Sequence, residues 1–218
     1  LEESVNTGMI WIQEKIGDKR FRQYVEKFGF GKKIGVKMDT EAAGDISSLS
    51  KPPEIYRANA SFGQGFSATP LQVAASYLAL ANEGKLMKPY IVKEVRYPNG
   101  RVDKTEPKVS ANVISSRASK LITGMLISVV ENGHGYMAQM KDHYVAGKTG
   151  TAQIAGPGGY TEVSNHTFVG YLPANNPKIV MLVKYEAPQR RWAESTAAPT
   201  FKKVADFAVN YFGIKGSR

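Results

Sequence analysis

Cysteine is absent from this 218-residue chain, and histidine is rare. Without cysteine the chain forms no disulfide and offers no thiolate to a metal, although the redox compartment stays undetermined. The three histidines, His134, His143 and His166, do not form the His-x-x-x-His spacing that is typical of zinc sites. We therefore predict neither a metal site nor a cofactor.

Long hydrophobic runs are also lacking. No apolar stretch approaches the ~18 residues needed to cross a bilayer, and no basic leader with an apolar segment begins the chain. The chain begins at Leu1 without an initiator methionine, and we expect it to be a fragment. Apolar residues make up 42% and charged residues 22%, which is typical of a folded globular unit rather than of a disordered one.

Acidic residues are scarce relative to basic ones. There are 19 Asp and Glu against 29 Lys and Arg, which gives a formal net charge of +10. Such a charge favours an anionic partner: nucleic acid, a membrane surface or an acidic cell-wall polymer. The basic residues are scattered and form no patch longer than a pair. We therefore predict no nucleic-acid partner and favour an anionic cell envelope.

Helical spacing of apolar residues dominates the first part of the chain. With their flanking caps and glycines, these patterns predict four helices: 7–16, 18–28, 69–82 and 115–130. Residues 29–66 are rich in Gly, Pro and Ser and predict a long loop. Pro98-Asn99-Gly100 predicts a hairpin between strands 90–97 and 101–104.

The last part of the chain has a different periodicity. Strand-like runs at 144–154, 166–172 and 178–185 predict a three-stranded antiparallel meander. A helix over 198–212 would cover it with one apolar face: Phe201, Val204, Ala205, Ala208, Tyr211 and Phe212.

These elements predict one domain over residues 1–218. It has a helical subregion over about 1–135, antiparallel strands over about 143–187 and a C-terminal helix over about 198–212. The fold class is α+β, an antiparallel sheet flanked by helices.

The stretch VAGKTGTAQ, residues 145–153, has two possible interpretations. Gly147-Lys148-Thr149 could end a phosphate-binding loop, which needs a first glycine five residues before the second and a helix directly after. The first position is Asp142, whose negative charge opposes phosphate, and strand and turn residues follow. The phosphate-loop interpretation therefore fails.

The second interpretation is an acyl-transfer site. On an edge strand, Lys148, Thr149 and Thr151 would present an ammonium group and two hydroxyls to a substrate. Gly150 would let that substrate lie close to the backbone, and a backbone N–H would stabilise an oxyanion. A Lys-Thr-Gly alone is weak evidence for such a site, because any exposed strand can contain it. It gains weight from Ser4-Val5-Asn6, a Ser-x-Asn before the first helix.

Beyond these motifs, the chain resembles class B penicillin-binding proteins, the septal and elongation-type transpeptidases of bacteria. The similarity covers nearly all of the chain, through ESVNTGM, KFGFGKKIGV, ANASFGQGFSATPLQVAASYLALANEGKLMKPYIVKEV, VAGKTGTAQ and HTFVGYLPANNPKIVMLV. It implies a penicillin-binding-protein/β-lactamase-like transpeptidase fold. It also implies an enzyme that cross-links stem peptides ending in D-Ala-D-Ala and that binds β-lactams.

The resemblance also implies roles for the site residues. Ser4 would relay a proton, Asn6 would hold the substrate amide, and Lys148 would supply positive charge. Thr149 and Thr151, with Gly150 between them, would bind the substrate carboxylate, and the Thr151 backbone N–H would donate to the oxyanion. Taken without Lys148, Ser4 and Asn6 are more simply a pair of helix caps.

The acylated serine of the family is missing from its expected place. It belongs to a Ser-x-x-Lys upstream of the Ser-x-Asn, which here begins at the fourth residue. A literal match, Ser48-Leu49-Ser50-Lys51, comes too late in the chain and precedes Pro52-Pro53, which block a helix. We interpret Ser48 as part of a surface loop. We expect the nucleophile, and two further strands of the sheet, to lie in a preceding N-terminal part that this fragment lacks, so the fragment alone would be inactive.

Two other functions stay open at this point. A relative that had lost its serine would be a non-catalytic scaffold for cell-wall assembly, and a basic nucleic-acid binder would show steeply salt-dependent affinity. The presence of Ser4, Asn6 and Lys148 argues against the scaffold, because a scaffold does not need these three residues. By resemblance, the parent protein would have a single membrane anchor and an extracytoplasmic catalytic domain. Its partners would be a membrane glycosyltransferase and the proteins of the division or elongation machinery.

Overall fold

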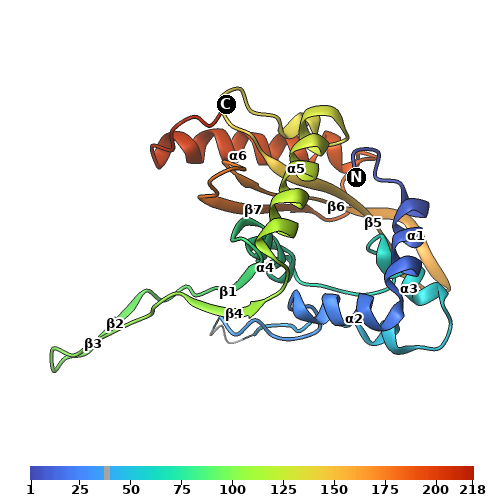
Figure 1. Cartoon of the computed structure of the whole chain (residues 1–218), viewed down its shortest axis with the longest axis horizontal. Coiled ribbons are helices and arrows are strands. Elements are labelled where there is room, and N and C mark those ends of the chain that lie inside the picture. The colour runs from blue at the N-terminus through green and yellow to red at the C-terminus, as the bar shows by residue number, and fades with distance from the viewer. Residues whose placement is uncertain (37–39) are drawn as a thin grey trace.

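The computed structural model describes residues 1–36 and 40–218 (Figure 1). The α-helices are α1 (Asn6–Ile16), α2 (Asp18–Lys27), α3 (Ile55–Ser61), α4 (Pro70–Ala81), α5 (Ser116–Asn132) and α6 (Ala197–Tyr211). The short 3₁₀ helices are η1 (Ser47–Ser50), η2 (Tyr136–Ala138) and η3 (Ala193–Ser195). The strands are β1 (Lys85–Lys88), β2 (Glu94–Arg96), β3 (Val102–Lys104), β4 (Lys108–Asn112), β5 (Ala146–Gly156), β6 (Gly159–Leu172) and β7 (Ile179–Tyr185).

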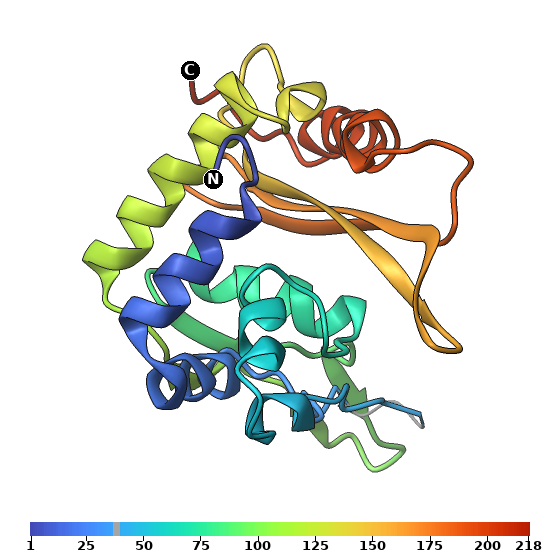
Figure 2. The ribbon, with the colours of Figure 1, turned by 90° about the vertical axis from the view of Figure 1, so that its right-hand side faces the viewer.

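The predicted meander is the antiparallel sheet β5-β6-β7, with helices on both faces (Figures 1 and 2). Successive side chains of a strand point to opposite faces. Phe168 and Leu172 of β6 therefore pack with Phe201 of α6, while Tyr171 packs toward α4 and α5. The α+β fold class is confirmed, with the sheet held between two apolar layers.

The β5–β6 hairpin differs from the prediction in its bounds: β5 is shifted by two residues along the chain, and β6 is longer than predicted. The two strands meet in a tight turn at residues 156–159, and β6 begins directly at Gly159 rather than at His166. Positions 160–165 hold mostly polar residues that mask the period-two pattern, because this end of the hairpin is largely exposed on both faces. Among the described strands, β5 lies at an edge of this sheet.

The prediction of a loop over residues 29–66 is wrong in part; its residues 37–39 lie outside the described residues. η1 and α3 both lie within it, and Ser48 is buried, not on the surface. The seven residues of α3 are stabilised by tertiary contacts, because the buried Arg57 donates to the carbonyl oxygens of Lys51 and Pro52 and pairs with Asp18. Local sequence carries no signal for such contacts.

The helix α4 is organised by its first turn. Thr69 and Gln72 form a reciprocal capping box, typically worth about 1 kcal/mol for the cap alone. The fully buried Gln72 amide also donates to the carbonyl oxygens of Lys32 and Ala43. One side chain therefore both begins the predicted helix and fixes the glycine-rich segment against it.

The hairpin around Pro98-Asn99-Gly100 is confirmed, with β2 and β3 shorter than predicted. It extends away from the rest of the molecule in Figure 1. The predicted helical subregion also contains β1 and β4, which form a second two-stranded sheet that the sequence did not predict.

The apolar face of α6 is only partly as predicted. Phe201 and Ala205 are buried, but Val204, Tyr211 and Phe212 are exposed. The buried face includes Ala197, Ala198 and Val209 instead. Within residues 1–36 and 40–218, we find no helix that combines the length and the apolar character needed to cross a membrane.

Candidate active site

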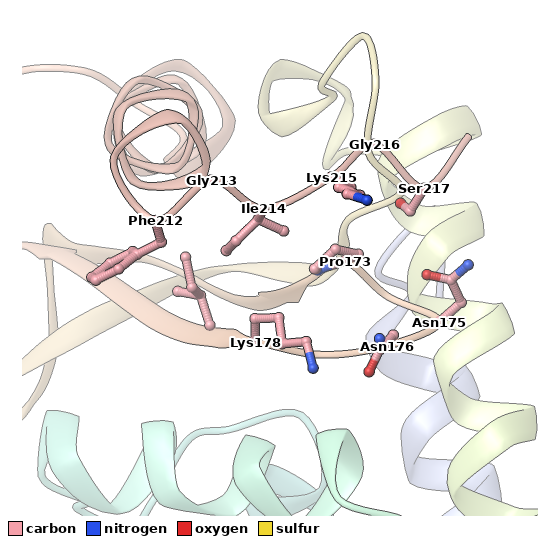
Figure 3. Close-up of a pocket in the computed structure, with 11 residues that line it drawn as sticks. Pro173, Asn175, Asn176, Lys178, Phe212, Gly213, Ile214, Lys215, Gly216 and Ser217 are labelled. Atoms are coloured by element: carbon pink, nitrogen blue, oxygen red, sulfur yellow. The ribbon is translucent and has the colours of Figure 1, made fainter.

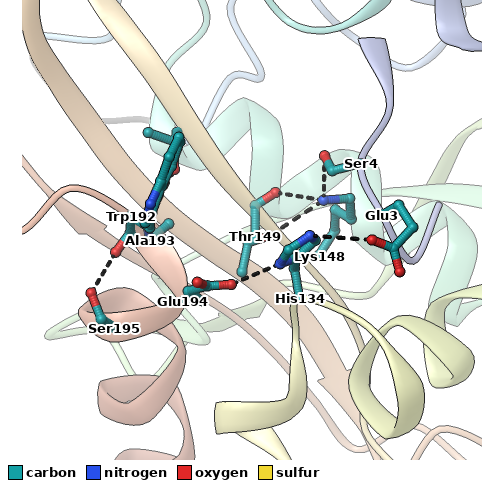
Figure 4. A network of polar contacts seen from close by, with 10 residues as sticks. Glu3, Ser4, His134, Lys148, Thr149, Trp192, Ala193, Glu194 and Ser195 are labelled. Atoms are coloured by element: carbon teal, nitrogen blue, oxygen red, sulfur yellow. Dashed lines mark hydrogen bonds and ion pairs between the residues drawn. The ribbon is translucent and has the colours of Figure 1, made fainter. Parts of the chain in front are cut away.

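The Lys-Thr-Gly strand and the Ser-x-Asn turn meet in the structure (Figure 4). The Nζ atom of Lys148 donates to Ser4 Oγ at 2.9 Å, although 144 residues separate them. The same ammonium group contacts the carbonyl oxygen of Thr149 at 3.1 Å and its Oγ1 at 3.3 Å. Two of the predicted motifs therefore form one polar cluster, as their chemistry requires.

Ser4 reaches Lys148 because its backbone is bent into an unusual conformation. Its φ is 50°, in the left-handed region that costs a non-glycine residue about 1–2 kcal/mol. The turn closes through the Ser4 N–H, which donates to the Leu1 carbonyl at 3.1 Å. The N-cap of α1 is Val5, with no side-chain cap, so the alternative interpretation of Ser4 as a helix cap does not hold.

Asn6 is placed near this cluster without joining it. It is the first residue of α1 and is exposed. Its part in the site stays a prediction, because the hydrogen bonds found among the described residues connect Lys148 to Ser4 and not to Asn6.

Lys148 lies in an environment that disfavours its charge. Burial lowers the pKa of its ammonium group below the usual 10.5, because a charge removed from water loses hydration. The neutral amine is therefore formed more easily than in a lysine exposed to water. A hydrogen-bonded hydroxyl and a lysine of lowered pKa are a pair able to exchange a proton.

Thr151 is exposed on the same strand, beyond Lys148. Its Oγ1 accepts a hydrogen bond from the backbone N–H of Ala193 in η3 at 3.2 Å. A hydroxyl that already accepts can still donate its own proton, and a substrate carboxylate is an acceptor. The contact therefore orients Thr151 for the predicted role.

Packing within the sheet gives one reason for glycine at position 150. A Cβ at this position would lie 2.6 Å from Oγ1 of Thr167, its partner on β6. The missing side chain makes room for the neighbouring strand β6. Contact between Gly150 and a substrate stays a prediction.

The buried His166 has a structural role. Its ring nitrogens contact Thr196 Oγ1 at 2.9 Å and Ser164 Oγ at 3.1 Å. Burial lowers its pKa, so the imidazole is favoured in its neutral form. With both ring nitrogens in contact with hydroxyl groups, the ring joins β6 to the segment before α6.

Sequence reasoning missed two residues beside this cluster, His134 and Glu194. The His134 ring contacts Glu194 at 2.8 Å and lies 3.7 Å from Glu3, next to Ser4 (Figure 4). They come from separate elements 60 residues apart, and the local sequence of neither predicts the contact.

One cavity of the structure lies in a different place. It has a volume of about 670 Å³ and lies between the start of β7 and the segment after α6 (Figure 3). Its lining includes Pro173, Lys178, Ile179, Phe212 and Ile214, and none of the predicted site residues. Its position beside β7 places it across the sheet from the edge strand β5.

Comparisons with known proteins identify the family of the chain. The sequence profile of the family described as "Penicillin binding protein transpeptidase domain" matches residues 1–206. Stage V sporulation protein D of Bacillus subtilis (strain 168) is 35% identical over 221 residues, which cover 99% of this chain and 34% of that protein. Penicillin-binding protein PbpB of Mycolicibacterium smegmatis is 33% identical and covers 97% of this chain and 35% of that protein.

Solved structures show the same similarity. Penicillin-binding protein 3 of Mycobacterium tuberculosis, complexed with aztreonam, superimposes with a TM-score of 0.91 at 29% identity, covering 100% of this chain and 51% of that one. The chain thus spans about a third of these curated relatives and about half of this solved chain. With the family profile matched over residues 1–206, the chain belongs to the penicillin-binding protein transpeptidase domain family, among its class B members.

Proposed function

We propose that the protein containing this chain is a serine-type peptidoglycan D,D-transpeptidase. The observation that carries the proposal is the hydrogen bond between Lys148 Nζ and Ser4 Oγ, which joins the two family motifs on one side of β5. The substrate is a stem peptide ending in D-Ala-D-Ala. A serine attacks it, releases the terminal D-Ala and passes the acyl group to the amine of a second stem peptide, which replaces one difficult step with two easier ones.

Each residue of the cluster has a separate part in this reaction. Ser4 relays a proton between the amine and the lysines, helped by the lowered pKa of Lys148. Thr149 and Thr151 donate to the substrate carboxylate, or to that of a β-lactam, and Asn6 holds the substrate amide. The backbone N–H of Thr151 donates to the oxyanion, a contribution typically worth about 3 kcal/mol.

The nucleophile lies outside residues 1–218 in this proposal. Ser48 is unsuited to the role, because its hydroxyl is buried in η1 and the backbone turns extended at Lys51. Apolar side chains exposed on α1, with Trp11 59% exposed, would be covered by further protein that carries the Ser-x-x-Lys helix. In the described part of the chain no strand pairs with the outer edge of β7, so upstream strands could add there, near the cavity of Figure 3.

Covalent labelling tests this proposal directly. A fluorescent penicillin is expected to acylate a serine preceding Leu1 in the longer natural protein, as identified by peptide mass spectrometry, and to leave the 218-residue chain unlabelled. Lys148→Ala in the longer protein should slow labelling by about 100-fold or more. Lys203→Ala, on the exposed side of α6, is the matched control and should have no effect.

The other outcomes separate the alternatives. Labelling of the 218-residue chain would show that the acylated serine lies within it. A longer protein that folds and is never labelled would contradict the enzyme and favour a non-catalytic scaffold. The same proposal includes a single-pass membrane anchor with an extracytoplasmic catalytic domain. A membrane glycosyltransferase and proteins of the division or elongation machinery would be its partners.

A further inference from the structure

The turn that carries Ser4 rests on the loop after α5. The backbone N–H of His134 donates to the Glu2 carbonyl at 3.3 Å, and Ser128 Oγ donates to the Glu2 carboxylate. The approach is so close that a Cβ on Gly133 would lie 2.7 Å from Glu2 Cα. The left-handed conformation of Ser4 is therefore held by contacts with a segment about 130 residues away, rather than by its own preference.

The side chain of His134 extends this contact to the opposite side of the site. Its Nδ1 hydrogen-bonds the carboxylate of Glu194 at 2.8 Å, and its Nε2 lies 3.7 Å from the carboxylate of Glu3 (Figure 4). Glu3 directly precedes Ser4. Glu194 directly follows Ala193, whose N–H orients the Thr151 hydroxyl. One imidazole thus joins the element that carries Ser4 to the element that orients Thr151.

We propose that His134 is a positioning residue that holds the Ser4 turn and the η3 segment at the separation that the proposed transpeptidase reaction needs. The inference rests on the proposed function and deepens it. The charged groups that face the ring are Glu3 and Glu194. Its side chain is 48% exposed, and such partly exposed pairs contribute little to stability. Misplacing a reacting group by about 1 Å, in contrast, costs up to about 100-fold in rate.

Two variants of the longer protein, His134→Ala and Glu194→Gln, test this inference. We expect each to lower the acylation rate constant for a fluorescent penicillin by about tenfold or more, with a nearly unchanged dissociation constant for the initial complex and a nearly unchanged Tm. His134→Asn keeps a nitrogen close to the position of Nδ1 and should recover much of the rate. Glu186→Gln, at an exposed carboxylate that pairs with Lys184, is the matched control and should match the wild type.

Hydrogen exchange of the amides of residues 2–5 supplies a readout that does not depend on acylation. Faster exchange confined to this turn and to residues 192–196 in His134→Ala supports the positioning role. Unchanged acylation and unchanged exchange in both variants would overturn it. If the wild type is never acylated, the proposed function fails, and the exchange measurement still decides whether His134 holds the turn. If His134→Ala is unfolded, the test rests on Glu194→Gln, which leaves the ring in place. Slower acylation and faster exchange in that variant support the positioning role, and no change in either overturns it.

Discussion

The two sides of the Ser4–Lys148 contact are built in opposite ways. Lys148 lies within β5, which pairs with β6 from Ala146 to Gly156 and rests on buried side chains such as Phe168. Ser4 lies in a short turn with a left-handed φ, held by contacts with the loop after α5. The difference indicates that the strand holds Lys148 in a fixed position, whereas the backbone strain lies in the turn at Ser4. Such strained residues often cluster at functional sites.

The largest expected effect comes from disturbing the strand. Gly147→Ala would place a Cβ 2.6 Å from the ring of Phe168, which is fully buried against Phe201, and 3.1 Å from the carbonyl oxygen of Val169. Because neither group has room to move, we expect the free energy of unfolding to fall by about 2–3 kcal/mol in urea titrations.

The matched control is the same substitution in a helix. In the described part of the structure, no atom lies within 4 Å of a Cβ built on Gly124 of α5. Gly124→Ala should therefore raise the free energy of unfolding by about 0.5–1 kcal/mol through helix propensity. Equal stability of the two variants would contradict the tight packing of β5 against Phe168.

The same contrast explains what the sequence could predict. Lys148 was found because Lys-Thr-Gly-Thr lies in a local strand pattern, and the meander follows from that pattern. The pairing of Ser4 with Lys148 came from family resemblance, since no spacing rule joins residues 144 positions apart. Neither the local strand pattern nor the family resemblance identified His134 and Glu194, because tertiary packing alone brings them together.

The errors have equally physical causes. The helix α6 has apolar residues on more than one side, so its sequence does not specify that Phe201 faces the sheet while Tyr211 faces away from it. The helix α3 has too few residues for its own propensity to decide, and the ion pair and carbonyl contacts of Arg57 stabilise it.

The second prediction concerns the cost of placing an ammonium group on this strand. Lys148→Met removes the buried charge, and we expect the variant to be about 1 kcal/mol more stable than the wild type near pH 7. In the longer protein, it should also lose the proposed acylation activity. Below the lowered pKa of the folded state, the lysine is protonated in both the folded and the unfolded protein, so the full cost of burial opposes folding there.

That stability difference should depend on pH in a defined direction. Because burial lowers the pKa of Lys148, the folded wild type releases its proton at a lower pH than the unfolded chain, whose pKa is near 10.5. The cost of burial therefore falls as pH rises between the lowered pKa and 10.5, and the advantage of Lys148→Met should shrink. Urea titrations between pH 7 and pH 10.5 measure it. An advantage that grows with pH would show that the lysine is stabilised in its charged form.

The smallest effect, and the one that isolates the turn, comes from comparing two substitutions at Ser4. Both Ser4→Gly and Ser4→Ala remove the hydroxyl that accepts from Lys148, so both should lose equally the acylation activity proposed for the longer protein. They differ in the backbone, because glycine adopts a φ of 50° without the steric cost that alanine meets. We expect Ser4→Gly to be more stable than Ser4→Ala by up to about 1 kcal/mol, measured as the difference in urea midpoint at constant slope. Equal stability would mean that the turn relaxes out of the left-handed region once the hydroxyl is gone, and that the contact with Lys148 is what maintains the strain.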